Sequence, residues 1–157
     1  MNWKNSKKQI FTQCEVMQIL KKVASTNSHK IIVGTDSVKL GETFVFANAI
    51  CVINDGSFYD RRFFYYKRKV IDSSYYDLSK RILKETTESI DIAFNIRKQI
   101  KNANIEIHAD VNTDSKHMSS KYRNMVEGYI NGCGFTCKVK PDSFVASGIA
   151  DVYTKKS

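Results

Sequence analysis

The stretch that decides the fold reads HKIIVGTDS at residues 29–37. Its apolar residues run together and end in a small, polar turn, which is typical of a buried strand. Two more strands are expected, over residues 42–53 and 58–70, joined by the turn-forming Asn54-Asp55-Gly56-Ser57. Three successive strands of this kind predict that the sheet begins with two antiparallel hairpins.

Helices and strands then alternate. Residues 72–102 predict one long helix, and the alternation of apolar and polar residues in NIEIHADV at 104–111 predicts a strand. A helix over 118–131, a short strand over 135–139 and a last helix that begins at Asp142 are expected after it. This order predicts an α/β fold, a mixed five-stranded sheet with helices on both faces.

The N-terminal segment is expected to be helical. Thr12 and Glu15 form a capping box, and Val16, Ile19 and Leu20 follow at helical spacing, which predicts a helix over residues 12–25. A chain of 157 residues has the length of one domain. Residues 1–28 are therefore interpreted as a helical extension of a domain formed by residues 29–157.

Composition narrows the class of partner. Lys and Arg total 25 against 16 Asp and Glu, a net charge of +9, which favours nucleic acid as a partner and an anionic lipid surface second. The longest apolar stretch, residues 44–53, is too short to span a bilayer, and no secretory signal is visible, so a cytoplasmic location is expected. Cys133 and Cys137 have no second pair to complete a zinc site, and reduced thiols are expected.

Four acidic residues are candidates for a site, and each has an ordinary alternative. Asp36 and Asp110 end predicted strands, where turn formers and functional residues both occur. Carboxylates on neighbouring strands repel each other unless a cation neutralises them. Glu85 lies on the apolar stripe of the long helix. Three interpretations are open: Glu85 binds a metal, it forms a buried ion pair, or it lies at the solvent-exposed edge of the stripe. Asp151 follows small residues in the last helix and is alternatively an exposed helical residue.

Glu88 is expected to differ from Glu85. It lies with Arg81, Lys84 and Asp91 on the polar face of the long helix, so a solvated carboxylate is predicted.

These elements and acids together resemble the ribonuclease H superfamily over roughly residues 29 to 156. More closely, three motifs resemble the YkuK-type family of ribonuclease H-like proteins: GTDS at 34–37, HADVN at 108–112 and KPDS at 140–143 with Ala150-Asp151. The position two residues after Asp36 is Val38, where exonucleases of the superfamily commonly carry a second acid. This difference argues against a proofreading exonuclease.

The resemblance implies a metal-dependent nuclease that hydrolyses phosphodiester bonds of RNA or DNA with two Mg²⁺ or Mn²⁺ ions. Asp36 would bridge both metals, Glu85 and Asp110 would each complete one metal's ligand shell, and Asp151 would hold the second metal. Oxygen ligands suit these ions. One ion would activate water and the other would stabilise the leaving oxygen.

Basic residues after the 104–111 strand are the predicted contacts to phosphate, with solvated surface charge as the alternative for each. They are Lys116, His117, Lys121 and Arg123, together with the basic residues of the 58–70 strand. Two other functions remain open: a nucleic-acid-binding module without turnover, and a protein-interaction domain whose positive charge is incidental.

Overall fold

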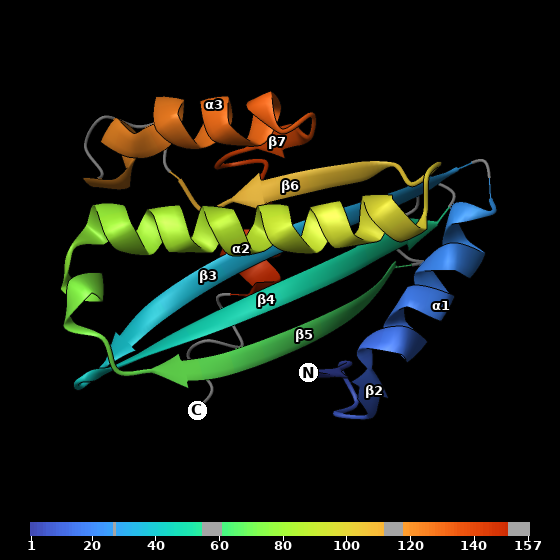
Figure 1. The fold of residues 1–157 in the computed structure, drawn as a ribbon, viewed down its shortest axis with the longest axis horizontal. Helices are drawn as coiled ribbons and strands as arrows, with labels where there is room; N and C mark the ends of the chain where they lie inside the picture. Colours follow the sequence, from blue (N-terminus) through green and yellow to red (C-terminus); the bar gives the residue numbers. More distant parts are fainter. Residues whose placement is uncertain (27, 55–60, 112–117, 151–157) are drawn as a thin grey trace.

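The described residues form one sheet of seven strands, in the order β2-β1-β5-β4-β3-β6-β7 (Figure 1). The computed structural model describes residues 1–26, 28–54, 61–111 and 118–150. The expectation of five strands is wrong, because two short N-terminal strands were not predicted. The strands are β1 (Asn2–Lys4), β2 (Ile10–Thr12), β3 (His29–Leu40), β4 (Thr43–Asn54), β5 (Arg61–Val70), β6 (Ile105–Ala109) and β7 (Thr136–Lys138).

The middle of the sheet follows the prediction. β3, β4 and β5 pair antiparallel in sequence order, and β6 pairs parallel with β3 and with β7. The described ladder between β3 and β6 ends where Thr35 lies opposite Ala109, whereas β3 continues along β4 to Leu40. β3 therefore extends past the end of β6. The predicted turn after Asn54 falls on residues 55–60, outside the described residues.

The helices cover both faces of this sheet. The α-helices α1 (Gln13–Ala24), α2 (Leu78–Gln99) and α3 (Arg123–Gly132) pack on one face, and the π-helical η3 (Val145–Ala150) packs on the other (Figure 1). Several predicted helices are shorter than expected, because short 3₁₀ turns precede the α-helices: η1 (Ser73–Tyr76) before α2 and η2 (Met118–Tyr122) before α3. Among the described residues, no helix is long and apolar enough to cross a membrane.

The N-terminal segment is part of the same core. The predicted capping box is confirmed, since Glu15 N–H donates to Thr12 Oγ1 over 3.2 Å and the Glu15 carboxylate accepts from Thr12 N–H over 2.7 Å. Trp3 on β1 is fully buried, and its indole N–H donates to Gln13 Oε1 over 2.6 Å. Burial of an aromatic ring of this size ties the N-terminal strands to the domain.

Alternation along β3 separates the two faces of the sheet. Ile31 and Val33 pack under the α-helices, whereas Ile32 packs on the opposite face with Val145 of η3. Gly34 lies on that opposite face, where a Cβ atom would be 2.9 Å from the backbone nitrogen of Ala146. Glycine at this position therefore allows η3 to approach the sheet closely.

Candidate active site

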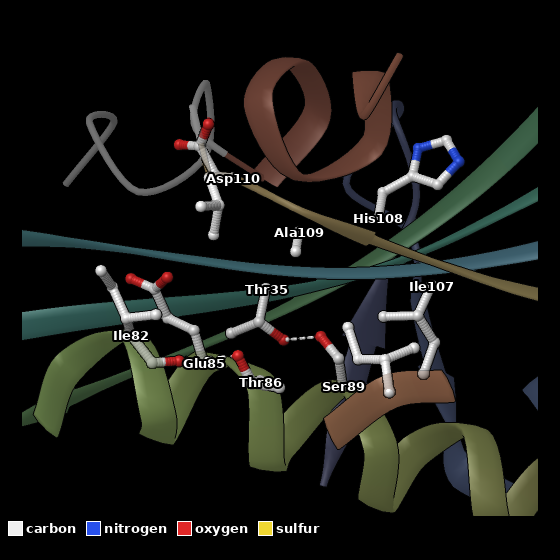
Figure 2. A pocket seen from close by; sticks show the side chains of 11 residues that line it. Thr35, Ile82, Glu85, Thr86, Ser89, Ile107, His108, Ala109 and Asp110 are labelled. Atoms are coloured by element: carbon white, nitrogen blue, oxygen red, sulfur yellow. Dashed lines mark hydrogen bonds between the residues drawn. The ribbon is translucent and has the colours of Figure 1, made fainter. Parts of the chain in front are cut away.

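Glu85 extends from α2 into a pocket against the sheet (Figure 2). Ile82 and Ser89, which lie three and four residues away on the same helix face, are buried, so the predicted orientation toward the sheet is confirmed. Ser37 of β3 donates a hydrogen bond from its hydroxyl to Glu85 Oε1. One turn further along α2, Ser89 and Thr35 join their hydroxyl groups over 2.8 Å. These two hydrogen bonds, at Glu85 and at Ser89, hold this turn of α2 against β3.

Asp110 lines the same pocket from the sheet, and its carboxylate points to the side of the strand that also carries the His108 ring (Figure 2). It follows the last residue of β6, and its side chain is 17% exposed. Lys140 places its ammonium group 2.8 Å from Asp110 Oδ1. Figure 2 shows Glu85 and Asp110 on the two sides of the pocket, toward the same end of it. The pocket volume of about 10 Å³ is close to the space that one water molecule needs.

The environment of Glu85 makes its carboxyl group a weak acid. Burial is the main cause and raises the pKa of Glu85 to about 8, although the hydroxyl of Ser37 and the nearby charge of Arg81 act in the opposite direction. The negative charge of Asp110 raises this pKa further. The two carboxyl groups are therefore close enough to interact, and near neutral pH Glu85 holds a proton in the absence of a cation.

Asp36 lies beside this pocket but on the other face of β3. Thr35 and Ser37 both bond to side chains of α2, so alternation directs Asp36 toward the face covered by η3. Asp36 is 7% exposed. Because the described ladder with β6 ends at Thr35, the next residues of β3 lie at the position where β6 has ended. Asp36 is therefore adjacent in sequence to Ser37, whose hydroxyl donates a hydrogen bond to Glu85.

Two of the four predicted acids line one pocket. Asp36 does not line it, and Asp151 lies outside the described residues, so the convergence of all four stays a prediction. Within the part of the chain that the structure describes, no three His, Cys, Asp or Glu residues are grouped to hold a metal ion. The donors present at the pocket are carboxylate oxygens, which are the ligands that Mg²⁺ and Mn²⁺ prefer.

In this fold, β3 extends past the end of its parallel neighbour β6, and one acid from α2 and one from the end of β6 lie at that point. A comparison of the sequence with known families agrees with this arrangement. A family model described as Ribonuclease H-like matches residues 14–155. The chain belongs to this family. No similar curated protein and no similar solved structure is found. The match begins inside α1 and extends beyond η3, so it covers the strands β3 to β7 but not the N-terminal strands β1 and β2.

Glu88 in this ribonuclease H-like domain is not a solvated carboxylate, and that prediction is wrong. Its side chain is 13% exposed and forms an ion pair with Arg68 of β5. Asn48 of β4 donates to its other oxygen over 3.3 Å, and Lys84 lies 3.9 Å away. The helical pattern could not reveal this contact, because Arg68 reaches Glu88 from a strand 20 residues earlier in the chain.

Arg81 was also assigned to the polar face of α2, yet it lies beside the site. Its guanidinium group is 5.7 Å from the ring of Phe44, and its charge acts on Glu85, one helical turn away. The Nε atom of Arg81 is buried without a hydrogen-bond partner in the described structure. This cation beside the acidic pocket was not predicted as a site residue.

His108 is a further buried group that the sequence analysis did not single out. Val145 N–H donates to His108 Nδ1 over 3.3 Å, so that nitrogen is the acceptor and Nε2 carries the proton toward Glu106, 2.7 Å away. Lys30 lies 3.2 Å from Glu106. The alternation of residues 104–111 places Glu106 and His108 on one face of the strand. This pattern could have predicted that the two side chains contact each other.

The structure does not test the predicted phosphate contacts. Lys116 and His117 lie outside the described residues. Lys121 is exposed and places its ammonium group 5.1 Å from the ring of Tyr122. Arg123 is engaged by Glu127 at 3.1 Å, which neutralises part of its charge. Contact of these residues with nucleic acid stays a prediction.

Proposed function

We propose that this ribonuclease H-like domain hydrolyses phosphodiester bonds of RNA or DNA with the help of Mg²⁺ or Mn²⁺. The observation that carries the proposal is the pair of carboxyl groups, Glu85 and Asp110, in one pocket at the end of β6. The net charge of +9 supports an anionic substrate. The pocket is too small for a nucleotide, so the substrate would lie across its mouth.

The chemistry of the pair fits a divalent cation. Burial and the charge of Asp110 hold Glu85 in its protonated form, and a cation would favour the ionised form of both groups. Glu85 and Asp110 would hold the ion, and the resemblance adds Asp36 and Asp151 as ligands. The bound ions would supply an activated water and stabilise the leaving oxygen. The hydrogen bond from the Ser37 hydroxyl would hold the Glu85 carboxyl group in position to bind the ion.

The narrower resemblance to the YkuK-type family is part of the proposal. It rests on GTDS at 34–37 and HADVN at 108–112, the two motifs that contain Asp36 and Asp110.

A nucleic-acid-binding module without turnover is the second candidate. The contact between Lys140 and Asp110 favours it, because the ammonium group already neutralises a carboxylate that a catalytic cation would need. In this case, the protonated Glu85 and the ion pair would form a stable site that requires no metal.

A cleavage assay separates the two candidates. Labelled RNA, DNA and hybrid oligonucleotides are incubated with the protein in Mg²⁺, in Mn²⁺ and in EDTA, beside Asp110→Asn and the exposed control Asp91→Asn. The proposal predicts metal-dependent cleavage by the wild type and the control, and none by Asp110→Asn. Binding without cleavage in any metal would support the module, and cleavage by Asp110→Asn at the wild-type rate would contradict the assignment of the site.

A further inference from the structure

Aromatic rings gather at the end of the sheet where η1 precedes α2. The strands β3 and β4 continue there past the end of β6 (Figure 1). Phe44 of β4 is fully buried, and its ring lies 5.4 Å from that of Tyr76 and 5.9 Å from that of Tyr75, both in edge-to-face arrangements. Tyr76 is nevertheless 55% exposed. The cluster therefore presents one ring to solvent on a fixed support.

Two cations lie beside these rings. Lys39 of β3 pairs across the sheet with Phe44, and its ammonium group lies 4.3 Å from the centre of the Tyr76 ring. The guanidinium group of Arg81 lies 5.7 Å from the Phe44 ring, and its Nε atom is buried without a hydrogen-bond partner among the described residues. Lys39 is exposed on a long, flexible stem, so its ammonium group can turn from the ring to an anion in solution.

The exposed ring lies close to the pocket of Glu85. On β3, Lys39 is two residues beyond Ser37, which donates a hydrogen bond to Glu85. Residues two apart share a face of a strand and are about 7 Å apart. On α2, Arg81 precedes Glu85 by one turn, a rise of about 6 Å. The strand and the helix therefore both lead from the pocket to Tyr76 on the same side of the sheet.

An exposed aromatic ring beside cations is the combination that binds single-stranded nucleic acid. Bases stack on such a ring, and the cations contact the phosphates. The two carboxylates next to η1, Asp72 and Asp77, accept backbone N–H groups and cap η1 and α2. The bases of a duplex already stack on one another, whereas an unpaired base is free to stack on an aromatic side chain. The chemistry of this surface therefore favours a single strand over a duplex.

We propose that Tyr76 stacks on a base of a single-stranded nucleic acid while Lys39 contacts a phosphate of the same strand. The inference rests on the proposed function insofar as the substrate is nucleic acid, and it narrows that substrate to a single strand. The positive charge of Arg81 lies between the stacked base and Glu85. Recognition would tolerate any base sequence, because every base has a face that can stack.

Fluorescence anisotropy in EDTA tests the stacking contact. The probes are a labelled single-stranded oligonucleotide, the same strand with abasic sites in place of its bases, and the corresponding duplex. Tyr76→Leu is expected to weaken binding of the single strand at least about fivefold and to leave binding of the abasic strand and the duplex unchanged. Tyr76→Phe retains the ring and should bind like the wild type. The control is Tyr129→Leu, at an exposed tyrosine of α3, which should have no effect.

A salt series with the single strand tests the phosphate contact. Lys39→Gln is expected to flatten the slope of log affinity against log salt by about 0.7, the value for one phosphate of a single strand. Lys101→Gln removes the same charge from an exposed position beyond the C-terminal end of α2 and should retain the slope. Because Lys39 is also exposed, this variant tests the site even if Tyr76→Leu does not fold. A wild-type slope in Lys39→Gln would overturn the phosphate contact.

Binding and cleavage can fail separately. Weaker binding by Tyr76→Leu, without cleavage by the wild type in any metal, would support the stacking site and refute hydrolysis. Cleavage by the wild type, with equal binding by Tyr76→Leu and Tyr129→Leu, would refute the stacking site and leave the proposed function standing. Absence of binding to every oligonucleotide would overturn the stacking site. So would binding to phosphatidylserine vesicles that Tyr76→Leu and Lys39→Gln abolish while oligonucleotide binding is unchanged.

Discussion

Replacement of Glu85 by Gln should increase stability at neutral and alkaline pH. Glu85 has an ordinary pKa near 4.5 and a pKa of about 8 in the folded protein. Between these values the unfolded chain has lost its proton and the folded chain has retained it. The free energy of unfolding therefore falls by about 1.4 kcal/mol per pH unit as pH rises from about 4.5 to 8. At pH 7 the free energy of unfolding has fallen by about 3 kcal/mol. A Gln side chain does not titrate, so the variant does not lose this stability.

Urea denaturation at a series of pH values measures this difference. The free energy of unfolding of Glu85→Gln minus that of the wild type should grow from pH 4.5 to pH 8 and then level off. Glu42→Gln is the matched control, because Glu42 is exposed in the turn between β3 and β4. Parallel stability curves for Glu85→Gln and the wild type would refute the buried, protonated state of Glu85.

The same urea denaturation, repeated in the presence of Mn²⁺, tests whether Glu85 binds a divalent cation. Binding to the native state alone stabilises a protein in proportion to the logarithm of ligand concentration. At pH 7, excess Mn²⁺ should raise the stability of the wild type and leave Glu85→Gln unchanged, which would narrow the gap between them. Equal stabilisation of both proteins would place the ion elsewhere.

The remaining predictions concern packing and acid stability. Glu88→Gln should destabilise the protein by about 1–3 kcal/mol in thermal unfolding, because it removes the charge that pairs with Arg68; no change would show that this ion pair contributes nothing. Gly34→Ala should cost about 1–3 kcal/mol in urea, because the new methyl group meets Ala146, and a neutral result would contradict the close approach of η3. Bonding to His108, and then the ion pair with Lys30, lower the pKa of Glu106, so its stabilisation is complete above about pH 4.5 and is lost as pH falls through the folded pKa. The stability advantage of the wild type over Glu106→Gln should therefore shrink below pH 4.5, and an advantage independent of pH would refute this account.

Local patterns in the sequence were sufficient for the centre of the fold. Alternation identified the strand that leads to Asp110, and helical periodicity placed Glu85 toward the sheet. These properties depend on residues two to four positions apart, which the sequence displays directly.

The errors arose where the deciding contact is distant in sequence or the element is short. β1 and β2 have three residues each, too few for a periodic signal, and they are stabilised by burial of Trp3 against the core. Glu88 resembles a solvated residue until Arg68 of β5 is placed opposite it. The relation of Asp36 to Glu85 depends on where the ladder of β6 ends, a property of two strands that neither strand's sequence displays alone.

Calorimetric titration with Mn²⁺ tests the central claim most directly, namely that Glu85 and Asp110 serve one ion site. The titration is run at pH 7 on the wild type, Glu85→Gln, Asp110→Asn and the double variant. A shared site predicts that each single variant loses most of the affinity, and that the double variant loses little more than either. Wild-type affinity in both single variants would contradict the claim.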